Sequence, residues 1–205
     1  MKIGITGQNG FIGYHLTHTI KFTLSEYSIV PFQRSFFEQE NSLRTFVSSC
    51  DVIVHLAGVN RAETDQKVYE SNLRLNTILK DALIRTKFRG HLIFASSFQE
   101  ESISLYGKAK KESRIFLKET AKKFGGNFTG LIIPNVFGPF CKPNYNSFVA
   151  TFCSKILNNE TPEVIQDANI PLLYVENLVQ EIIDIIESKN ERKSEHIEPD
   201  IEVKV

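Results

Sequence analysis

The sequence predicts an α/β fold in which helices cover both faces of a doubly wound parallel sheet. Short apolar segments with strand character alternate with amphipathic segments of helical period along most of the chain. The segment 51–57 (DVIVHLA) is almost continuously apolar, as strands buried on both faces are. A glycine-rich turn directly follows the first strand and precedes the first helix. Together these features indicate a Rossmann-like sheet, whose ligands bind at the carboxyl ends of its strands.

Each element follows from the local pattern of apolar residues, taken in chain order. The expected strands are residues 2–6, 28–32, 51–57, 91–97 and 128–134, the last ending where Pro134 lacks a hydrogen-bond donor. The expected helices are residues 11–24, 39–49, 69–85, 106–124, 148–158 and 176–188. We take residues 1–188 as one domain. Residues 189–205 are charged and aperiodic before a last apolar alternation, so we expect a linker or a truncated C-terminal edge there.

Composition and charge exclude several classes of protein. Of the 205 residues, 41% are hydrophobic and 23% are charged, which is typical of an ordinary folded soluble chain. Lys and Arg together number 24, as do Asp and Glu, so no excess positive charge attracts nucleic acid or a membrane surface. The sequence contains neither an apolar run of membrane-spanning length nor a signal-peptide pattern, so we expect a cytoplasmic protein. Three cysteines without Cys-x-x-Cys spacing favour reduced thiols, and we expect no metal site.

The glycine-rich turn predicts a dinucleotide-binding site. Gly7, Gly10 and Gly13 are spaced Gly-x-x-Gly-x-x-Gly between the first strand and the first helix. The first glycine permits the tight turn, the second lets backbone N–H groups approach a pyrophosphate, and the third lets helix and strand pack closely. An ordinary strand-to-helix turn is the alternative. We assign Gly7, Gly10, Phe11, Ile12 and Gly13 to the cofactor site.

The end of the second strand favours NADP over NAD. An acidic residue about 20 positions after the turn would bind the ribose 2′-hydroxyl of NAD, and residues 30–35 (VPFQRS) contain none. They offer Arg34 instead, whose guanidinium can bind a 2′-phosphate in a charge-assisted, forked geometry. The alternative is that Arg34 is a solvated surface charge. We expect NADP(H), with NAD as the less favoured cofactor.

A tyrosine and a lysine one helical turn apart form the candidate catalytic pair. Tyr106 and Lys110 stand at i and i+4, on one face of the expected helix 106–124. A neighbouring ammonium stabilises phenolate, so we expect the pKa of Tyr106 to be lowered and its phenol to exchange a proton with a substrate oxygen. Ser96 and Ser97 end the preceding strand, where a hydroxyl can bind the same oxygen. Without these serines, a chance surface pair would be the simpler interpretation.

Taken together, these residues resemble the short-chain dehydrogenase/reductase family, and the resemblance runs over residues 1–188. In that family the glycine turn binds the cofactor, and a Ser, a Tyr and a Lys form the catalytic set. The resemblance implies that Ser97, Tyr106 and Lys110 take those roles here, and that Lys110 also holds the nicotinamide ribose. It further implies cofactor contacts at the strand ends, from Leu56, Ala57, Gly58, Ser96 and Pro134.

Residues 134–139 (PNVFGP) and 173–177 (LYVEN) look like the extended, nucleotide-sugar-modifying branch of the family. In that branch the asparagine at the position of Asn135 lies near the diphosphate of the sugar nucleotide. Residues 55–61 (HLAGVNR) and 141–147 (CKPNYNS) resemble a subfamily of capsular polysaccharide synthesis, which uses NADPH to reduce a UDP-linked 4-keto-2-acetamido-2,6-dideoxyhexose. The alternative is that these loops only pack or cap. The substrate-binding residues that the resemblance implies are Arg61, Asn135, Lys142, Asn144 and Asn146.

The sequence therefore predicts an NADPH-dependent reductase of a UDP-sugar, with a small C-terminal portion that binds the substrate. An epimerase or dehydratase that recycles its cofactor is the alternative of the same class. Glu100 and Glu101 precede Tyr106, but they do not match the Asp-Glu pair of such dehydratases. An alternative of another class is a non-catalytic module that senses NADP; such modules commonly lose the tyrosine or the lysine, and this chain keeps both. Besides the UDP-sugar, a homodimer is left open as a partner.

Overall fold

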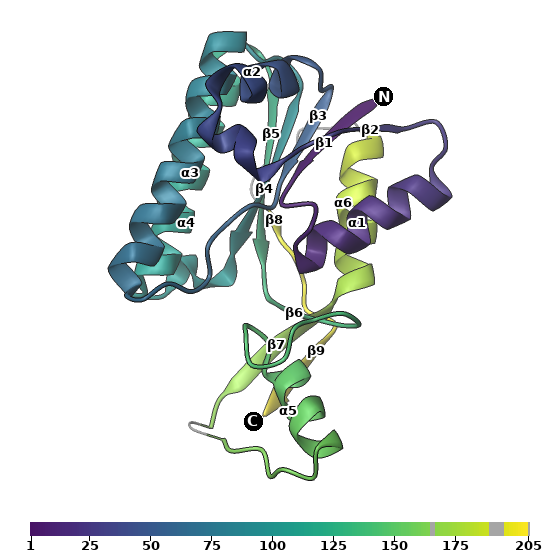
Figure 1. The fold of residues 1–205 in the computed structure, drawn as a ribbon, viewed down its shortest axis with the longest axis vertical. Coiled ribbons are helices and arrows are strands. Elements are labelled where there is room, and N and C mark those ends of the chain that lie inside the picture. The colour runs from purple at the N-terminus through teal and green to yellow at the C-terminus, as the bar shows by residue number, and fades with distance from the viewer. Residues whose placement is uncertain (165–166, 189–194, 205) are drawn as a thin grey trace.

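A sheet of parallel strands lies at the centre of the protein. The computed structural model describes residues 1–164, 167–188 and 195–204. Within these residues six strands form the sheet in the order β2-β1-β3-β4-β5-β8, and every neighbouring pair is parallel (Figure 1). The strands are β1 (Lys2–Thr6), β2 (Ser28–Val30), β3 (Val52–His55), β4 (His91–Ser97), β5 (Asn127–Ile133) and β8 (Glu195–His196).

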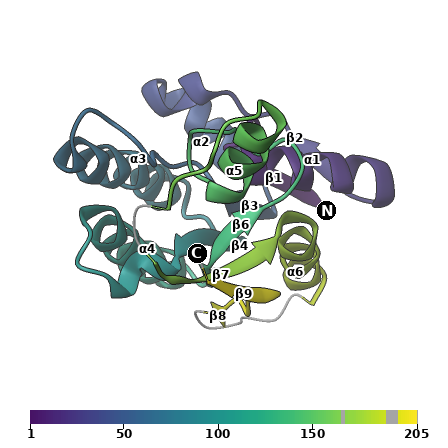
Figure 2. The same cartoon turned by 90° about the horizontal axis from the view of Figure 1, so that it is seen from below.

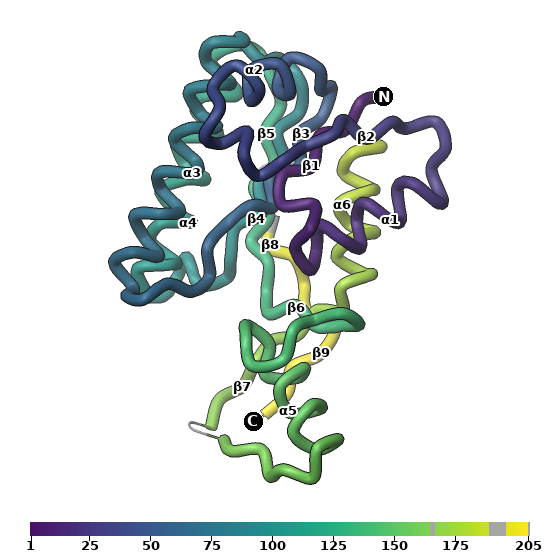
Figure 3. Tube along the Cα trace, in the orientation of Figure 1, coloured from purple at the N-terminus to yellow at the C-terminus, as the bar shows by residue number. Residues whose placement is uncertain are grey.

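Helices cover both faces of this sheet, as the ribbon and the Cα trace show (Figures 1 and 3). They are α1 (Phe11–Thr23), α2 (Glu40–Ser48), α3 (Asp65–Thr86), α4 (Leu105–Lys123) and α6 (Val175–Ser188). Leu16 of α1 and Ile182 of α6 are buried in one core, whereas Phe46 of α2, Leu83 of α3 and Leu117 of α4 are buried in a second core on the opposite face. The predicted doubly wound α/β fold is therefore confirmed. None of the helices in the described ranges has both the length and the apolar composition that crossing a membrane requires.

The carboxyl ends of the central strands meet at one edge of the sheet, where the predicted site residues lie. β1 has β2 on one side and β3 on the other, so the direction of winding reverses next to β1. In such sheets ligands bind in the crevice beside this reversal. The glycine turn follows β1, residues 56–58 follow β3, and the two serines end β4. The fold thus brings segments that are far apart in the sequence to one edge.

A second, smaller sheet lies beyond this edge (Figures 1 and 2). Among the described residues it contains β6 (Asn135–Phe137), β7 (Asn169–Tyr174) and β9 (Ile201–Lys204), and α5 (Phe148–Leu157) belongs to the same end of the molecule. β7 pairs with β6 in parallel and with β9 in the antiparallel direction. We did not predict β6 or β7, because β6 is only 3 residues long and Pro171 interrupts the strand pattern of β7.

The C-terminal residues take part in both sheets. Residues 189–205 are the segment for which we expected a linker or a truncated edge, and of these 189–194 and 205 lie outside the described residues. β8 pairs with β5 at one edge of the central sheet, and β9 is an edge strand of the small sheet. Residues 195–204 therefore pair as sheet edges instead of running free as a linker. The domain boundary at residue 188 stays a prediction.

Most of the expected elements of the central sheet and its helices agree with the structure to within about two residues at each end. α3 is the main exception. It begins at Asp65 instead of at residue 69, because the Thr64 hydroxyl caps the helix by accepting a backbone hydrogen bond at 3.2 Å. β2 ends at Val30 instead of at residue 32, since the Phe32 carbonyl accepts a hydrogen bond from the Gln8 side chain at 2.7 Å.

Candidate active site

The turn between β1 and α1 can be built only with glycine at two of its positions. Gly7 has a φ of +77°, and a Cβ atom there would lie 2.9 Å from the Ala57 nitrogen. A Cβ atom at Gly13 would lie 2.2 Å from the Gly7 carbonyl oxygen, closer than any real contact. Glycine at these positions lets β1, the start of α1 and the segment after β3 approach one another closely. This arrangement is the one that the glycine spacing predicts.

Among the described residues, no side chain caps the N-terminus of α1. Its N-cap residue is Gly10, which has no side chain to cap the helix, and the first turn contains no acidic residue. The first N–H groups of a helix have no partner within the helix, and the helix dipole makes this end attractive to anions. The N–H groups of Phe11, Ile12 and Gly13 therefore lie where a pyrophosphate would accept hydrogen bonds.

Arg34 begins a short 3₁₀ helix, η1 (Arg34–Glu38), just after β2. Its side chain is exposed and makes no hydrogen bond or ion pair with another described residue. The Gln8 side chain of the glycine turn donates to the Phe32 carbonyl, so the segment that leads to Arg34 is tied to the turn. The guanidinium is thus available to a ligand at this edge, as the prediction of a 2′-phosphate contact requires.

The segment after β3 runs between the glycine turn and α4. The Leu56 N–H donates to the Thr6 carbonyl at 3.1 Å, and the Ala57 N–H donates to the Thr6 hydroxyl at 3.3 Å. A Cβ atom at Gly58 would lie 3.3 Å from the Nζ atom of Lys110. The predicted cofactor residues Leu56, Ala57 and Gly58 therefore lie beside β1 on one side and beside the lysine on the other.

A buried polar network holds this segment in place. His55 is fully buried; its Nδ1 atom lies 2.6 Å from the Thr6 hydroxyl, and its Nε2 atom lies 2.7 Å from the Asn76 Oδ1 atom. The Asn76 amide nitrogen donates to the Ser113 hydroxyl and to the Asn72 carbonyl, so we assign the imidazole proton to Nε2. Burial lowers the pKa of His55 to about 3. The neutral imidazole thus accepts from Thr6 and joins β1 and β3 to α3 and α4.

The buried His55 makes stability depend on pH. An unfolded His55 binds a proton below about pH 6.5, whereas the folded residue stays neutral down to about pH 3. The contribution of the neutral imidazole is complete above about pH 6.5 and falls by up to about 1.4 kcal/mol per pH unit below it. We expect His55→Gln to be less stable than wild type at pH 7 but to lose less of its free energy of unfolding between pH 7 and pH 5. Urea denaturation of both proteins at pH 7 and at pH 5 measures these free energies of unfolding. If His55→Gln lost as much free energy of unfolding as wild type between pH 7 and pH 5, the assignment of a buried neutral imidazole to His55 would be contradicted.

Lys110 lies at the centre of the carboxyl edge. The residue is 5% exposed, and its ammonium donates to the Ala95 carbonyl of β4 at 2.9 Å. The same Nζ atom lies 5.2 Å from the ring centroid of Phe94 and 5.7 Å from that of Tyr106. Burial lowers the pKa of Lys110 to about 8, and the carboxylate of Glu100 opposes this shift. The side chain is therefore still largely protonated at neutral pH.

The protonation of Tyr106 corrects the expectation from the sequence. We expected Lys110 to lower the pKa of the phenol, but burial raises the pKa of Tyr106 to about 12. The reason is geometric, because the ammonium approaches the ring of Tyr106 and gives its hydrogen bond to the Ala95 carbonyl. Tyr106 is accordingly a neutral phenol that can donate a proton.

The two serines at the end of β4 differ in accessibility. Ser96 is buried, and its hydroxyl donates to the carboxylate of Glu100. Ser97 is partly exposed; its oxygen accepts the Gln99 N–H at 3.2 Å, which leaves its own proton for another acceptor. Ser97 pairs in register with the last residue of β5, and the buried Pro134 follows directly. Of the two serines, Ser97 is the one open to a ligand.

Three of the predicted substrate residues meet around a tyrosine. The guanidinium of Arg61 donates to the Asn144 carbonyl at 3.1 Å and lies 5.8 Å from the ring centroid of Tyr145. The Nζ atom of Lys142 also lies 5.8 Å from that centroid. Sequence reasoning missed Tyr145, because an aromatic residue in a polar loop is no signal until the loop is placed against Arg61. The loop after β3 and the loop after β6 thus form one cationic surface with an aromatic centre.

The other two predicted substrate residues are not joined to this cluster by hydrogen bonds among the described residues. Asn135 is exposed on β6, and its amide makes a long hydrogen bond of 3.5 Å to the Pro171 carbonyl of β7. Asn146 is exposed and has no hydrogen bond to a described side chain or backbone group. Their roles toward a substrate stay predictions.

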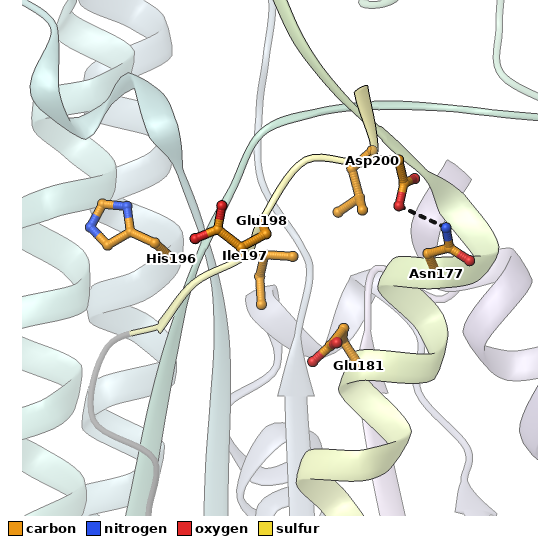
Figure 4. Close-up of a pocket in the computed structure, with 7 residues that line it drawn as sticks. Asn177, Glu181, His196, Ile197, Glu198 and Asp200 are labelled. Carbon is orange, nitrogen blue, oxygen red and sulfur yellow. Dashed lines mark hydrogen bonds between the residues drawn. The ribbon is translucent and has the colours of Figure 1, made fainter. Parts of the chain in front are cut away.

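A cavity of about 430 Å³ lies between α6 and the β8–β9 segment (Figure 4). Glu181, Glu198 and Asp200 give it an acidic lining, and it contains none of the predicted site residues. The carboxylate of Asp200 already accepts hydrogen bonds from the Tyr174 N–H at 2.6 Å and from Asn177 at 2.8 Å. An acidic cavity repels phosphate groups, so it is not the nucleotide site. Within the described ranges no three His, Cys, Asp or Glu residues are grouped to hold a metal ion.

The fold and the residues at its carboxyl edge are those of a nucleotide-dependent α/β enzyme family. The model of the NAD dependent epimerase/dehydratase family matches residues 3–198, and the chain belongs to this family. The resemblance to the extended short-chain dehydrogenases/reductases that the motifs indicated is thereby confirmed.

Two relatives share about a third of the sequence. The chain is 32% identical over 208 residues to the UDP-2-acetamido-2,6-beta-L-arabino-hexul-4-ose reductase of Pseudomonas aeruginosa, a match that covers 100% of this chain and 55% of that protein. It is 31% identical to the solved structure of CapF, a capsular polysaccharide assembling protein of Staphylococcus aureus, with a TM-score of 0.78, over 100% of this chain and 54% of that one. The chain therefore spans about half the length of these relatives.

The fold is also similar to that of a more distant enzyme. The UDP-glucose 4-epimerase of Thermotoga maritima, solved with UDP-glucose, superposes with a TM-score of 0.84 at 20% identity. This match covers 100% of the present chain and 79% of the epimerase. At this identity the similarity supports the fold alone.

Proposed function

We propose that the chain carries the reductase activity of an NADPH-dependent enzyme, which reduces the 4-keto group of a UDP-linked 2-acetamido-2,6-dideoxyhexose for capsule or O-antigen sugars. One observation carries the proposal: the buried Lys110 ammonium lies between Gly58 and the Ala95 carbonyl, one helical turn from Tyr106. This pair at the carboxyl edge suits carbonyl reduction. The substrate class is supported by the names of the P. aeruginosa reductase and of CapF. A homodimer stays a prediction.

The residues at the edge fit a dinucleotide cofactor. Side chains at Gly7 and Gly13 would clash with neighbouring backbone atoms, so glycine keeps the turn narrow. The uncapped N-terminus of α1 presents N–H groups suited to a pyrophosphate. Lys110 would hold the hydroxyls of the nicotinamide ribose. Arg34, exposed and unpaired among the described residues, would bind a 2′-phosphate, which favours NADP(H) over NAD. When bound, this cofactor supplies the hydride for the reduction.

The side chains at the edge would supply the proton and orient the substrate. Tyr106 is protonated at neutral pH, because burial raises the pKa of its phenol, so it can give a proton to the carbonyl oxygen as the hydride arrives. Ser97 has a free hydroxyl proton with which to orient the same oxygen. The ammonium of Lys110 then stabilises the phenolate that Tyr106 becomes. The roles of Tyr106 and Lys110 follow from their protonation states, and that of Ser97 follows from its free hydroxyl proton.

The cationic loops would hold the diphosphate of the sugar nucleotide. Arg61 and Lys142 both lie against the ring of Tyr145, and their charges are exposed, so two anionic phosphates can pair with them. Asn144 lies in the same cluster, and Asn135 and Asn146 offer amides nearby in the chain. Of the surfaces described above, this one has the charge that a UDP group requires.

The two alternatives fit less well. A dehydratase needs a free acid or base beside Tyr106, but the carboxylate of Glu100 is buried and paired with Arg114 at 2.7 Å, and Glu101 is exposed near His196. A module that only senses NADP has no use for a catalytic phenol, whereas Tyr106 and Lys110 are both present and lie together. Reduction therefore remains the proposal.

Binding of UDP tests the substrate part of the proposal. We expect UDP at a hundredfold excess over its dissociation constant to stabilise the fold by about 2.7 kcal/mol, since it binds the folded state alone. ADP and simple ketones should give no comparable shift in a thermal-shift assay in the presence of NADP. Arg61→Ala and Lys142→Ala should weaken UDP binding with NADPH affinity intact, and Lys111→Ala, an exposed lysine on α4, serves as the control. If no uridine nucleotide raises the Tm, the substrate assignment is wrong.

A further inference from the structure

Glu100 is a buried carboxylate next to the proposed active site. It lies in the 3₁₀ helix η2 (Phe98–Glu101), which links β4 to α4, and its side chain is only 3% exposed. Arg114 of α4 binds it through two nitrogens: Nε lies 2.9 and 3.0 Å from the two carboxylate oxygens, and Nη2 lies 2.7 Å from one of them. The Ser96 hydroxyl donates to the same carboxylate. Burying a charge is costly unless such partners are present, so Arg114 and Ser96 are what allow Glu100 to stay charged in this buried position.

These contacts fasten the end of β4 to α4 at two successive residues. Ala95 accepts the hydrogen bond of the Lys110 ammonium, and Ser96 is bound to Glu100, which Arg114 holds in turn. Lys110 and Arg114 stand one turn apart on α4. The same strand end carries the open hydroxyl of Ser97, so its position depends on both attachments.

Among the described groups around the Lys110 ammonium, Glu100 is the one that carries a negative charge. The groups that interact with the ammonium are Glu100 from η2, Tyr106 from α4 and His55 from β3. Arg114 of α4 is paired with Glu100 beside them. Tyr106 is a neutral phenol, His55 is a neutral imidazole, and Arg114 is a second cation. Burial lowers the pKa of Lys110, and the carboxylate of Glu100 acts in the opposite direction.

We propose that Glu100 is a positioning residue of the active site, which through Ser96 and Arg114 fixes the end of β4 and keeps the buried Lys110 side chain positively charged. This inference rests on the proposed function, because it assigns Glu100 to the reductase site instead of to acid–base chemistry. It gives the Glu100–Arg114 pair a role beyond stability, since the charge of Lys110 is what a ribose and a developing phenolate need.

The direction in which Glu100→Gln shifts the pKa of Lys110 separates this role from a merely structural one. We expect Glu100→Gln to lower the pKa of Lys110 by about one unit, the lower end of the effect of a close opposite charge. If Glu100 only held the fold together, its removal would let water reach Lys110 and raise that pKa toward about 10.4. Protein labelled with ¹³C at the lysine ε carbons reports the titration by NMR, and the Lys110 signal is identified by its loss in Lys110→Arg. Neither cofactor nor substrate is needed.

Two further variants complete the test. Glu101→Gln removes the neighbouring carboxylate, which is exposed and lies 4.0 Å from His196, and it should leave the titration of Lys110 unchanged. Arg114→Gln removes the competing cation and should keep the pKa of Lys110 at or above the wild-type value, so it tests the charge argument even where Glu100→Gln fails to fold. A raised or unchanged pKa of Lys110 in folded Glu100→Gln, or a lowered one in Arg114→Gln, would overturn the inference.

Cofactor binding distinguishes this inference from the proposed function itself. If Lys110 must be charged to hold the ribose, NADPH affinity should weaken above about pH 8 in wild type and at a lower pH in Glu100→Gln. Wild type that fails to bind NADPH at any pH would contradict the proposed function and leave the NMR result standing. If NADPH affinity weakened at the same pH in both proteins, only the role of Glu100 would be contradicted.

Discussion

Tyr106→Phe should reduce turnover of a UDP-linked 4-keto sugar by at least about 10²-fold, the usual effect of losing a general acid. The substitution removes one hydroxyl and keeps the ring that packs against Lys110. Because burial raises the pKa of Tyr106 to about 12, the wild-type phenol stays protonated at every pH at which the protein would be assayed. The loss should therefore be nearly independent of pH between about 6 and 9. NADPH oxidation, followed by its absorbance, measures it.

A second tyrosine provides the matched control for that experiment. Tyr69 of α3 also lies beside a lysine, 5.4 Å from the Nζ atom of Lys108, but its hydroxyl already donates its proton to Glu112 at 2.9 Å. Tyr69→Phe should leave turnover within about twofold, because the hydroxyl proton of Tyr69 is already bound by Glu112. NADPH should bind Tyr106→Phe as it binds wild type. Undiminished NADPH oxidation by Tyr106→Phe would remove the tyrosine from the proposed chemistry.

The features that the sequence predicted well are those that depend on neighbouring residues in the chain. The glycine turn requires close backbone approaches at Gly7 and Gly13, and the spacing of these glycines after a strand indicates this requirement. Ser97 ends β4 because the apolar pattern of that strand stops there. Since the carboxyl ends of parallel strands share an edge, these local assignments were enough to place Lys110 and Gly58 close together.

What the sequence did not predict depends on packing between distant segments. The i, i+4 spacing placed Lys110 beside Tyr106, but it carries no information on burial, and burial is what raises the pKa of the phenol. The pairing of Glu100 with Arg114 joins residues 14 positions apart across the start of α4, and neither has a motif. Tyr145 joins the cationic loops only because the fold brings Arg61 to it. Such contacts become visible only once the strands and helices have been placed.

Arg34→Ala should weaken NADPH binding by about 1.5 to 3 kcal/mol, or roughly 10- to 150-fold, and should hardly change NADH binding. The physical reason is that the 2′-phosphate, which NADH lacks, would lose a charge-assisted partner at the end of β2. Arg34 is exposed, and its removal breaks no hydrogen bond or ion pair among the described residues, so the free energy of unfolding should stay nearly the same. Fluorescence titration of both cofactors gives the ratio of dissociation constants.

The control for Arg34 is Arg74, an exposed arginine of α3 that approaches the same short helix. Its guanidinium lies 3.0 Å from the carboxylate of Glu38, at the far end of η1 from Arg34. Arg74→Ala removes the same charge from the same region, so it corrects for a general loss of positive potential near the cofactor. If Arg34 binds the phosphate directly, only Arg34→Ala narrows the preference for NADPH over NADH. An equal loss of affinity for both cofactors in Arg34→Ala would show that this residue does not distinguish them, and the preference for NADP(H) would then have to come from another part of the edge.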